Sequence, residues 1–426
     1  MNRVVFHIDV NSAFLSWEAV YRLKHLGGNL DLRMVPSAVG GDVTMRHGII
    51  LAKSIPAKKY GIHTGQSVTE ALRKCPELLL VPPNYGLYQK SSEAFIHILK
   101  QYSPAVEQYS IDEAYMEMTG MEGLFGKPEE AAEEIRKRIG RELGFTVNIG
   151  VANNKVLAKM AADFTKPDRV HTLWTEEIEK KLWPLPVSSL FFVGRATFRK
   201  LRNLGIKTIG ELAEADPRMI KSHLGKMGEV IHAFSRGIDC SAVEPVPPPN
   251  KGYGNSTTIA FDVPERETAH LVLLSLAETV AARLRADGVR AGVLAVGIKD
   301  CDFRYYSHQM SFHSPTNITE EIYEAACRTF DQAWDGIPIR HLGIHMSHVA
   351  AGNSRQAGLF ERKDYEKLEQ LDKAVDEIRK RFGNDSLRRA SFVESQSNNQ
   401  VRYVDHMSGG ISREKRTVDY KKQNIV

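Results

Sequence analysis

The chain has 426 residues, of which 42% are hydrophobic and 26% are charged, and its 57 basic and 52 acidic residues leave a net charge of +5. This length exceeds what a single hydrophobic core usually serves, so we expect two to four domains. No run of eighteen apolar residues occurs, which excludes a membrane-spanning helix. The modest positive charge permits nucleic-acid binding without requiring it.

The cysteines and the N-terminal sequence indicate the cellular compartment of the protein. Cys75, Cys240, Cys301 and Cys327 are far apart and lack the spacing of a metal site, so we expect reduced thiols. A strand-like run follows Arg3 directly, which leaves no room for a signal peptide. We therefore expect a cytoplasmic protein.

The first 151 residues alternate between strand and helix patterns. The clearest helix opens at Pro128, carries acids in its first turn and stops at Gly144. The expected elements are a strand over 1–10, a helix that carries Phe14, a strand over 78–81, a helix over 83–102, a hairpin over 107–118, the helix after Pro128 and a strand over 147–151. The order strand, helix, two hairpin strands, helix, strand predicts a ferredoxin-like sheet.

The rest of the chain predicts a second module over 174–241, a Pro-rich extended linker, and a third module that repeats the order of the first. The expected elements of the third module are a strand over 253–261, a helix over 268–287, alternating strands around 294–298 and 342–346, and a helix capped by Thr319 that runs to Trp334. A further helix is expected over 361–382, and the polar stretch from Glu394 onward is expected to be disordered.

Three carboxylates stand out against this framework. Asp9 ends the first strand, and Asp112 and Glu113 lie in the hairpin, so the ferredoxin-like order brings all three to one end of the sheet. An isolated Asp-Glu pair is usually only a solvated turn. Three acids at one sheet end, however, are what two-metal phosphoryl transfer requires, because Mg²⁺ prefers hard oxygen ligands held close together.

The sequence around these acids resembles that of one protein family, and the resemblance extends from about residue 3 to about residue 390. The segments that carry the resemblance are His7-Ile8-Asp9-Val10-Asn11-Ser12-Ala13-Phe14, Ser110-Ile111-Asp112-Glu113, the run from Asn154 to Asp163, and Lys166-Pro167. In order and spacing they resemble the Y-family DNA polymerases, the lesion-bypass enzymes of the bacterial polymerase IV and V type.

The resemblance implies an α+β right-hand polymerase with a ferredoxin-like palm, small fingers, a helical helix–hairpin–helix thumb and a βαββαβ-like little-finger domain. The implied division of the chain is palm 1–10 and 79–173, fingers 11–78, thumb 174–241, linker 242–252, little finger 253–350, and a tail over 351–426 with a clamp-binding motif and a helix. The implied activity is template-dependent DNA synthesis of low fidelity, which adds dNTPs to a primer 3′-hydroxyl and bypasses damaged template bases in DNA repair and the SOS response.

By the resemblance, the catalytic residues are Asp9, Asp112 and Glu113, which hold two Mg²⁺ ions together with the carbonyl of Val10. Asp9 and Asp112 are expected to bridge both ions, and Glu113 to serve the catalytic one. Many members carry a further acid two residues after the first. That position is Asn11 here, so it does not count as a carboxylate ligand.

The expected nucleotide-binding residues are Phe14, Ser12, Ala13, Ile55, Lys58 and Lys166. Phe14 corresponds to the family's steric gate, an aromatic ring that leaves no space for a 2′-hydroxyl. Ile55 and Lys58 stand where the family usually has Tyr and Arg, and Lys offers a point charge in place of a bidentate fork. The alternative to a nucleotide contact is that Phe14 is an ordinary core residue and that Lys166 is a solvated loop lysine.

Two segments are expected to contact DNA. Gly194, Arg195 and Thr197 lie in a stretch that resembles a helix–hairpin–helix, which offers backbone N–H groups to a phosphate. Its alternative is an ordinary helical turn. Asn255, Ser256 and Thr257 open the third module, which resembles the little finger.

Gln356, Leu359 and Phe360 resemble the bacterial sliding-clamp-binding pentapeptide, and the alternative is a helix lead-in. The implied partners are therefore primer-template DNA, a dNTP and a sliding clamp, bound by a monomer that contacts no membrane.

Two rival functions remain open from the sequence. One is a non-catalytic DNA-binding relative that recruits partners through its tail, against which the three intact acids argue. The other is a metal-dependent nuclease, since two-metal sites also hydrolyse DNA. Phe14 together with Lys58 and Lys166 fits nucleotide addition better.

Overall fold

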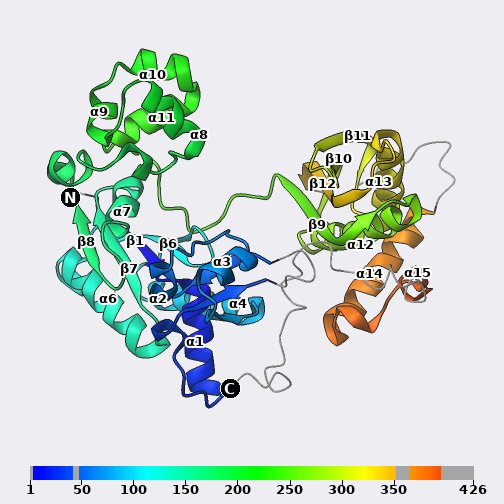
Figure 1. The fold of residues 1–426 in the computed structure, drawn as a ribbon, viewed down its shortest axis with the longest axis horizontal. Coiled ribbons are helices and arrows are strands. Elements are labelled where there is room, and N and C mark those ends of the chain that lie inside the picture. Colours follow the sequence, from blue (N-terminus) through cyan, green and yellow to red (C-terminus); the bar gives the residue numbers. More distant parts are fainter. Residues whose placement is uncertain (1–2, 42–47, 352–363, 395–426) are drawn as a thin grey trace. The chain divides into compact units, whose positions relative to one another are not determined.

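The structure is a computed structural model that describes residues 3–41, 48–351 and 364–394 (Figure 1). These residues form two compact units. The first holds residues 3–40 and 50–247, and the second begins at Pro248 and also takes in residues 41, 48 and 49. In the part of the chain so described, no helix has the length and apolar character needed to cross a membrane.

A five-stranded sheet forms the centre of the first unit, in the order β5-β6-β1-β7-β8. Its strands are β1 (Val5–Val10), β5 (Val106–Gln108), β6 (Glu113–Glu117), β7 (Val147–Ala152) and β8 (Val170–Leu173). The pairs from β5 to β7 are antiparallel, and β8 adds to β7 in parallel. The first four strands have the ferredoxin-like order, so the predicted α+β fold with this sheet is confirmed.

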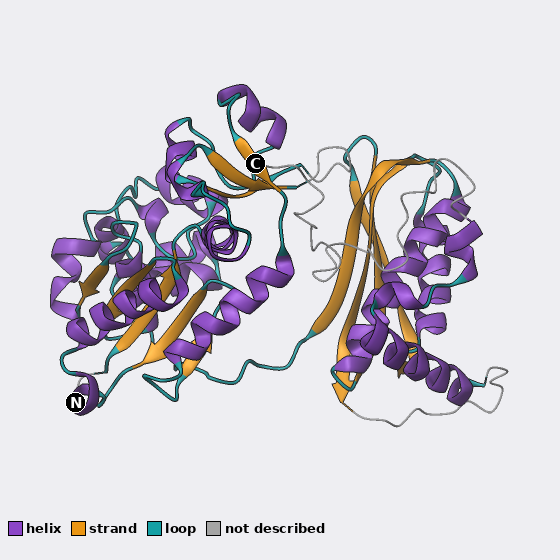
Figure 2. Ribbon diagram, turned by 90° about the horizontal axis from the view of Figure 1, so that it is seen from below, coloured by secondary structure: helices purple, strands orange, loops and turns teal. Residues whose placement is uncertain are grey.

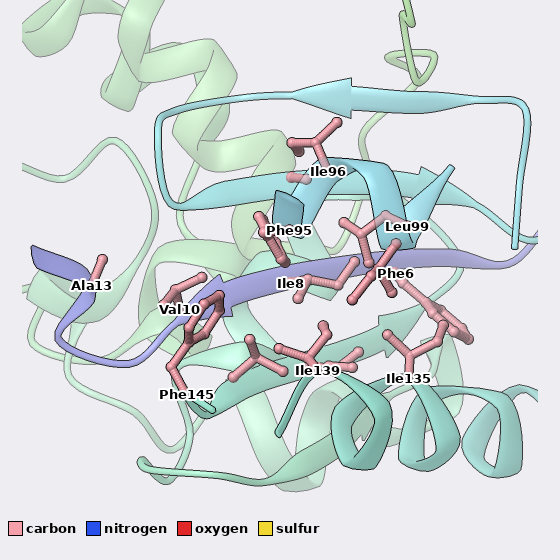
Figure 3. Packing of buried hydrophobic residues seen from close by; sticks show 14 of the residues in the cluster. Phe6, Ile8, Val10, Ala13, Phe95, Ile96, Leu99, Ile135, Ile139 and Phe145 are labelled. Carbon is pink, nitrogen blue, oxygen red and sulfur yellow. The ribbon is translucent and has the colours of Figure 1, made fainter. Parts of the chain in front are cut away.

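Strand β1 lies in the middle of this sheet, and side chains pack against both of its faces. Figure 3 shows Phe6, Ile8 and Val10 on one face, packed with Phe95 and Ile135. Those two residues come from helices α4 (Tyr85–Leu99) and α6 (Pro128–Leu143). A strand buried on both faces reads as a continuous apolar run, and Val5–Val10 does so apart from His7 and Asp9.

Helix α7 (Lys155–Ala162) covers the opposite face, where Val5 and Tyr115 pack with Leu157. It lies against β7 so closely that a Cβ on Gly150 would collide with the carbonyl oxygen of Ala158 and the backbone nitrogen of Ala162. Gly150 therefore fixes the distance of this helix from the sheet.

A smaller sheet lies beside the first, in the order β3-β2-β4. Its strands are β2 (Ser37–Gly40), β3 (Ile50–Lys53) and β4 (Leu79–Val81), with helices α1 (Ala13–His25), α2 (Ile55–Lys59) and α3 (Val68–Lys74). Strand β4 pairs in parallel with β2 and not with the large sheet. The resemblance predicts a boundary before residue 79, whereas residues 79–81 belong to the same small sheet as residues 37–40.

Four helices form the module that follows the large sheet. They are α8 (Arg195–Asn203), α9 (Ile209–Glu214), α10 (Pro217–Leu224) and α11 (Lys226–Ser235). Their buried residues, such as Leu201 and Ile231, belong to the same apolar cluster as Leu157 of α7. The helical module and the face of the sheet that α7 covers therefore share one core.

The second unit contains a four-stranded antiparallel sheet in the order β11-β10-β12-β9. Its elements are β9 (Gly252–Val263), α12 (Arg266–Ala286), β10 (Val289–Asp300), β11 (Tyr305–Thr316), α13 (Thr319–Ala333) and β12 (Ile339–Ala351). Figure 2 shows the helices gathered on one face of this sheet. The predicted repeat of the element order is confirmed, but the first strand now lies at an edge.

One predicted detail of this unit is wrong. Thr319 does not cap α13, because the capping position is Ile318. The backbone N–H and the hydroxyl of Thr319 instead bond to Asp372 and Arg285. The acid that satisfies this helix start comes from a later helix, which the local sequence does not indicate.

That later helix is α14 (Tyr365–Phe382), which confirms the predicted helix over its described part. Ion pairs hold it to the unit: Arg285 binds Asp372 and Asp376, and Arg379 binds Glu278. The short helix α15 (Ala390–Glu394) follows. The predicted clamp motif at Gln356, Leu359 and Phe360, and the predicted disorder beyond Glu394, lie outside the described residues.

The close approach of α7 to β7 gives a test of the packing. Gly150→Ala should lower the free energy of unfolding by about 3 kcal/mol, because the added methyl group must displace the backbone of α7. Gly140→Ala, on α6, is the control, since no heavy atom lies near its added Cβ. It should be neutral or stabilise by about 0.5–1 kcal/mol. Equal stability of the two variants in urea unfolding would contradict the packing described.

Candidate active site

The antiparallel pairing of β1 with β6 brings the acids together. Asp9 lies directly opposite Glu113 in the register, and the backbone N–H of Val10 donates to the carbonyl of Asp112 at 3.0 Å. Because side chains alternate along a strand, Asp9 and Glu113 project from the face of the sheet that α7 covers. The expectation that the three acids gather at one end of the sheet therefore agrees with the backbone geometry.

Asp9 is largely buried and is paired with Lys166, whose Nζ lies 3.0 Å from Oδ1 of Asp9 and 2.8 Å from Oδ1 of Asp163. Burial raises the pKa of Asp9 above its ordinary value, and the Lys166 ammonium works against that rise. The neighbouring Glu113 adds to it, since two carboxylates this close disfavour a second negative charge.

Glu113 is paired with Lys159, whose Nζ lies 2.9 Å from both carboxylate oxygens. Burial alone would raise the pKa of Glu113, but His7 and the Lys159 ammonium outweigh burial and hold it well below its ordinary range. Burial lowers the pKa of the His7 imidazole. Glu113 is therefore kept as a carboxylate by a lysine that comes from α7.

Asp112 differs from the other two acids. Its carboxylate accepts a hydrogen bond from the Ser110 hydroxyl at 2.7 Å. Within the described ranges, no group of three or more His, Cys, Asp or Glu side chains is arranged as a ready-made metal site. The side-chain donors are nevertheless all carboxylate oxygens, which suits Mg²⁺, and the ammonium groups of Lys159 and Lys166 already pair with Glu113 and Asp9. The residues therefore fit a divalent cation.

Phe14 lies in the first turn of α1, three residues after the buried Asn11. Its ring stacks on that of Tyr88 at a centroid distance of 4.4 Å and an angle of 8°. Tyr88 is fully buried, and its hydroxyl donates to the buried Glu18 at 2.9 Å. Phe14 is thus half-buried and backed by a fixed ring.

Ser12 and Ala13 form the turn from β1 into α1. Ser12 is exposed and has φ of 47°, a left-handed conformation that is uncommon for a residue other than glycine. Ala13 is buried. Strained backbone of this kind, here three residues after Asp9, clusters at functional sites.

The other expected nucleotide contacts come from the smaller sheet. Ile55 and Lys58 lie on α2, which Ser54 caps by accepting from the backbone N–H of Ala57. Both side chains are exposed. Burial and the charge of Lys58 lower the pKa of the nearby Lys53, so this segment carries concentrated positive charge.

The predicted helix–hairpin–helix turn is exposed at the start of α8. Gly194 is the capping residue, and no side chain bonds to the first backbone N–H groups of this helix. Gly194 and Arg195 are exposed and Thr197 is half-buried. Free N–H groups at an exposed helix start are suited to a phosphate.

The predicted DNA contacts at 255–257 lie in β9, and only one of the three side chains is on the face of the sheet that no helix covers. Ser256 is exposed, whereas Asn255 and Thr257 are half-buried. Strand alternation turns Asn255 and Thr257 toward the helix-covered face, beside Ile344 and Leu342. Of the three residues, Ser256 is therefore the one placed for a contact on the open face.

Sequence reasoning missed Lys159. Two lysines four residues apart, Lys155 and Lys159, share one side of a short and otherwise apolar helix, and each binds an acid of the hairpin, Glu107 and Glu113. Lysines in a buried helix imply buried acids opposite them, since unpaired charges are seldom buried. That spacing was the available signal.

Comparisons with known proteins match three segments of the chain. The profile of the impB/mucB/samB family matches residues 8–163, and the profile of that family's C-terminal domain matches residues 250–359. A profile described as the DNA polymerase-iota thumb domain matches residues 189–239.

Relatives match over nearly the whole chain. DNA polymerase IV of Clostridium acetobutylicum is 43% identical over 400 residues, which cover 93% of this chain and 100% of that protein. DNA polymerase IV of Clostridium kluyveri is 36% identical over 408 residues, again 93% and 100%. A solved Y-family DNA polymerase chimera of Dbh and Dpo4 has a TM-score of 0.70 at 20% identity, and covers 82% of this chain and 100% of its own. This last likeness concerns the fold.

The pairing of Glu113 with Lys159 can be tested by stability. Lys159→Met keeps the aliphatic stem but removes the charge, and should lower the free energy of unfolding at pH 7 by about 2 kcal/mol. Because the pKa of Glu113 is lower in the folded state, its stabilisation exists above the unfolded pKa and is lost as pH falls. The difference from wild type should therefore shrink below about pH 4.

The control for this prediction is Lys137→Met, which removes an exposed partner of Glu133 on α6. It should change stability by about 0.5 kcal/mol or less. A Lys159→Met deficit that stays constant from neutral to acidic pH would mean that lost packing, and not the charge pair, causes it.

Proposed function

Because the chain belongs to the impB/mucB/samB family of Y-family translesion DNA polymerases, and is therefore a DNA-directed DNA polymerase, we propose that it extends primers across damaged template bases by two-metal catalysis. The observation that carries the proposal is the register of Asp9 opposite Glu113, beside Asp112 and within reach of Lys166. Low-fidelity synthesis during DNA repair and the SOS response is the proposed setting.

Asp9, Asp112, Glu113 and the Val10 carbonyl would hold two Mg²⁺ ions, as their oxygen chemistry favours. When bound, such ions activate a 3′-hydroxyl and neutralise charge on the triphosphate and the leaving pyrophosphate. The chain's own part is to hold Asp9 and Glu113 as neighbours on a rigid sheet and to supply lysines that balance their charge.

Lys166 and Lys58 are proposed to grip the triphosphate of the incoming nucleotide. Lys166 pairs with Asp9 in the structure, so its ammonium already lies at the catalytic carboxylates. Lys58 is exposed on α2, where it adds to the positive charge near Lys53. Ile55 lies in the same turn and, with Ser12 and Ala13, supplies the remaining proposed contacts.

Phe14 is proposed to be the steric gate against ribonucleotides. The stack on Tyr88 supports this role, because a ring held from behind cannot move aside for a 2′-hydroxyl without disturbing a buried residue. The ring is half-buried, so part of it stays accessible, and it lies two residues after the strained Ser12.

DNA is proposed to bind through phosphate contacts that carry no sequence preference. The exposed start of α8 at Gly194 and Arg195, with Thr197, offers backbone N–H groups and positive charge. Ser256 is exposed on β9, and the imidazole of His345 lies so close to Gly254 that a Cβ there would press on it. The clamp contact through Gln356, Leu359 and Phe360 rests on the sequence alone.

Removal of an acid tests the catalytic assignment. Asp112→Ala or Glu113→Ala should reduce primer extension by a factor of at least about 10³, because each removes an oxygen ligand at the reacting centre. Affinity for primer-template should stay close to wild type, since phosphate contacts elsewhere hold the DNA. The measurements are extension with Mg²⁺ and dNTPs, and DNA binding by fluorescence anisotropy.

The same assay separates the rival functions. Extension by the wild type supports the polymerase, shortening of the primer would indicate a nuclease, and binding with neither reaction would indicate a non-catalytic relative. Near-normal turnover in both Ala variants would sink the metal-ligand assignment.

Sugar selection tests Phe14. Phe14→Ala should raise the efficiency of ribonucleotide insertion by about 10²-fold or more while dNTP insertion falls little, because the ring acts only against the 2′-hydroxyl. The measurement is the rNTP/dNTP ratio of kcat/KM. The control is Phe125→Ala, remote from the site beside Tyr102, which should leave that ratio unchanged. An unchanged ratio in Phe14→Ala would make Phe14 a core residue.

A further inference from the structure

A pair of asparagine side chains occupies the space between β1, β7 and the segment 162–168. Asn11 follows β1 and Asn148 lies in β7, and both are buried, with exposed fractions of 9% and 0%. Nδ2 of Asn11 donates to Oδ1 of Asn148 at 3.1 Å. A buried side-chain amide pair of this kind is stable only if its remaining donors and acceptors are satisfied.

Each amide has a single possible orientation. Oδ1 of Asn11 accepts from the backbone N–H of Asp168 at 2.9 Å, and also from the Thr146 hydroxyl at 3.0 Å. Nδ2 of Asn148 donates to the carbonyls of Ala162 and Thr165 at 3.0 and 2.7 Å. Because a backbone N–H only donates and a carbonyl only accepts, neither amide can turn over.

The consequence is that Asn11 has no free lone pair for a metal ion. Its carbonyl oxygen has two acceptor positions, and Thr146 and Asp168 use both. Asn11 therefore does not act as a neutral ligand beside Asp9, although it lies two residues away.

The segment that the amides hold carries Lys166. Bonds from Asn148 fix the chain at Ala162 and Thr165, before the lysine, and the bond to Asn11 fixes it at Asp168, just after. Arg136 of α6 adds an ion pair to Asp168 at 2.5 Å. The lysine is thus anchored on both sides, with its Nζ 3.0 Å from Asp9.

We propose that Asn11 and Asn148 are positioning residues that set the place of the Lys166 ammonium and thereby the enzyme's grip on the triphosphate of the incoming nucleotide. The inference rests on the proposed phosphate-binding role of Lys166. A long lysine side chain loses less entropy on binding when its backbone is fixed, so the pair acts on nucleotide affinity more than on the chemical step.

The decisive variant is Asn148→Asp, which keeps the shape but places a carboxylate against two carbonyl oxygens. KM for the dNTP should rise about tenfold, since a charged contact is misplaced, while kcat changes by about threefold or less. Primer-template affinity should not change. Asn11→Asp loses one of three side-chain bonds and should raise KM by a smaller factor. It decides the matter if Asn148→Asp fails to fold.

A double-mutant cycle separates positioning from general damage. If Asn148 acts through Lys166, then Asn148→Asp should raise KM little further in the Lys166→Ala background. An equal rise in both backgrounds would overturn the proposal. The control is Asn153→Asp, which removes a comparable amide bond to the carbonyl of Arg3 and should leave KM unchanged.

The Lys166→Ala variant alone distinguishes the two levels of the argument. An unchanged KM would overturn the proposed role of Lys166 and this inference with it. A raised KM in Lys166→Ala, with unchanged KM in both the Asn148→Asp and Asn11→Asp variants, would overturn only the inference.

Discussion

The antiparallel pairing of β1 with β6 is the constraint on which the rest of the site depends. It sets Asp9 opposite Glu113. The hydrogen bond from the backbone N–H of Val10 to the carbonyl of Asp112 continues this pairing by one more residue. A slip of one residue would turn every side chain of β1 to the other face and carry Asp9 into the apolar layer under α4 and α6. The apolar residues of β1 therefore fix the strand register, and with it the position of Asp9, in addition to forming the core.

Acids this close repel one another, and lysines from two separate parts of the chain offset their charge. Lys159 reaches Glu113 from α7, a helix whose distance from the sheet is set by Gly150. Lys166 reaches Asp9 from a segment held by buried amides. Each counter-charge thus depends on a packing contact outside the site, so that changes in the core should alter the electrostatics of the site.

The sequence predicted the fold well where periodicity or chain terminators were strong, as in the helix from Pro128 to Gly144. It predicted the meeting of Asp9 with Glu113 because strand order follows from element order. It could not predict two long-range partners, the pairing of β4 with β2 and the bond from Asp372 to the start of α13. Such contacts join residues far apart in the chain, and neither periodicity nor spacing encodes them.

The two βαββαβ modules show how one element order can give two kinds of surface. In the first, β1 lies inside the sheet with helices on both faces, so its residues are apolar except for His7 and for Asp9 near the strand end. In the second, β9 lies at an edge and one face stays open. The residues of β9 alternate accordingly, with Tyr253 buried and Gly254 and Ser256 exposed. A fully covered sheet holds a few groups rigidly and suits catalysis, whereas a sheet open on one face offers area without pockets and suits a long, uniformly charged partner such as DNA.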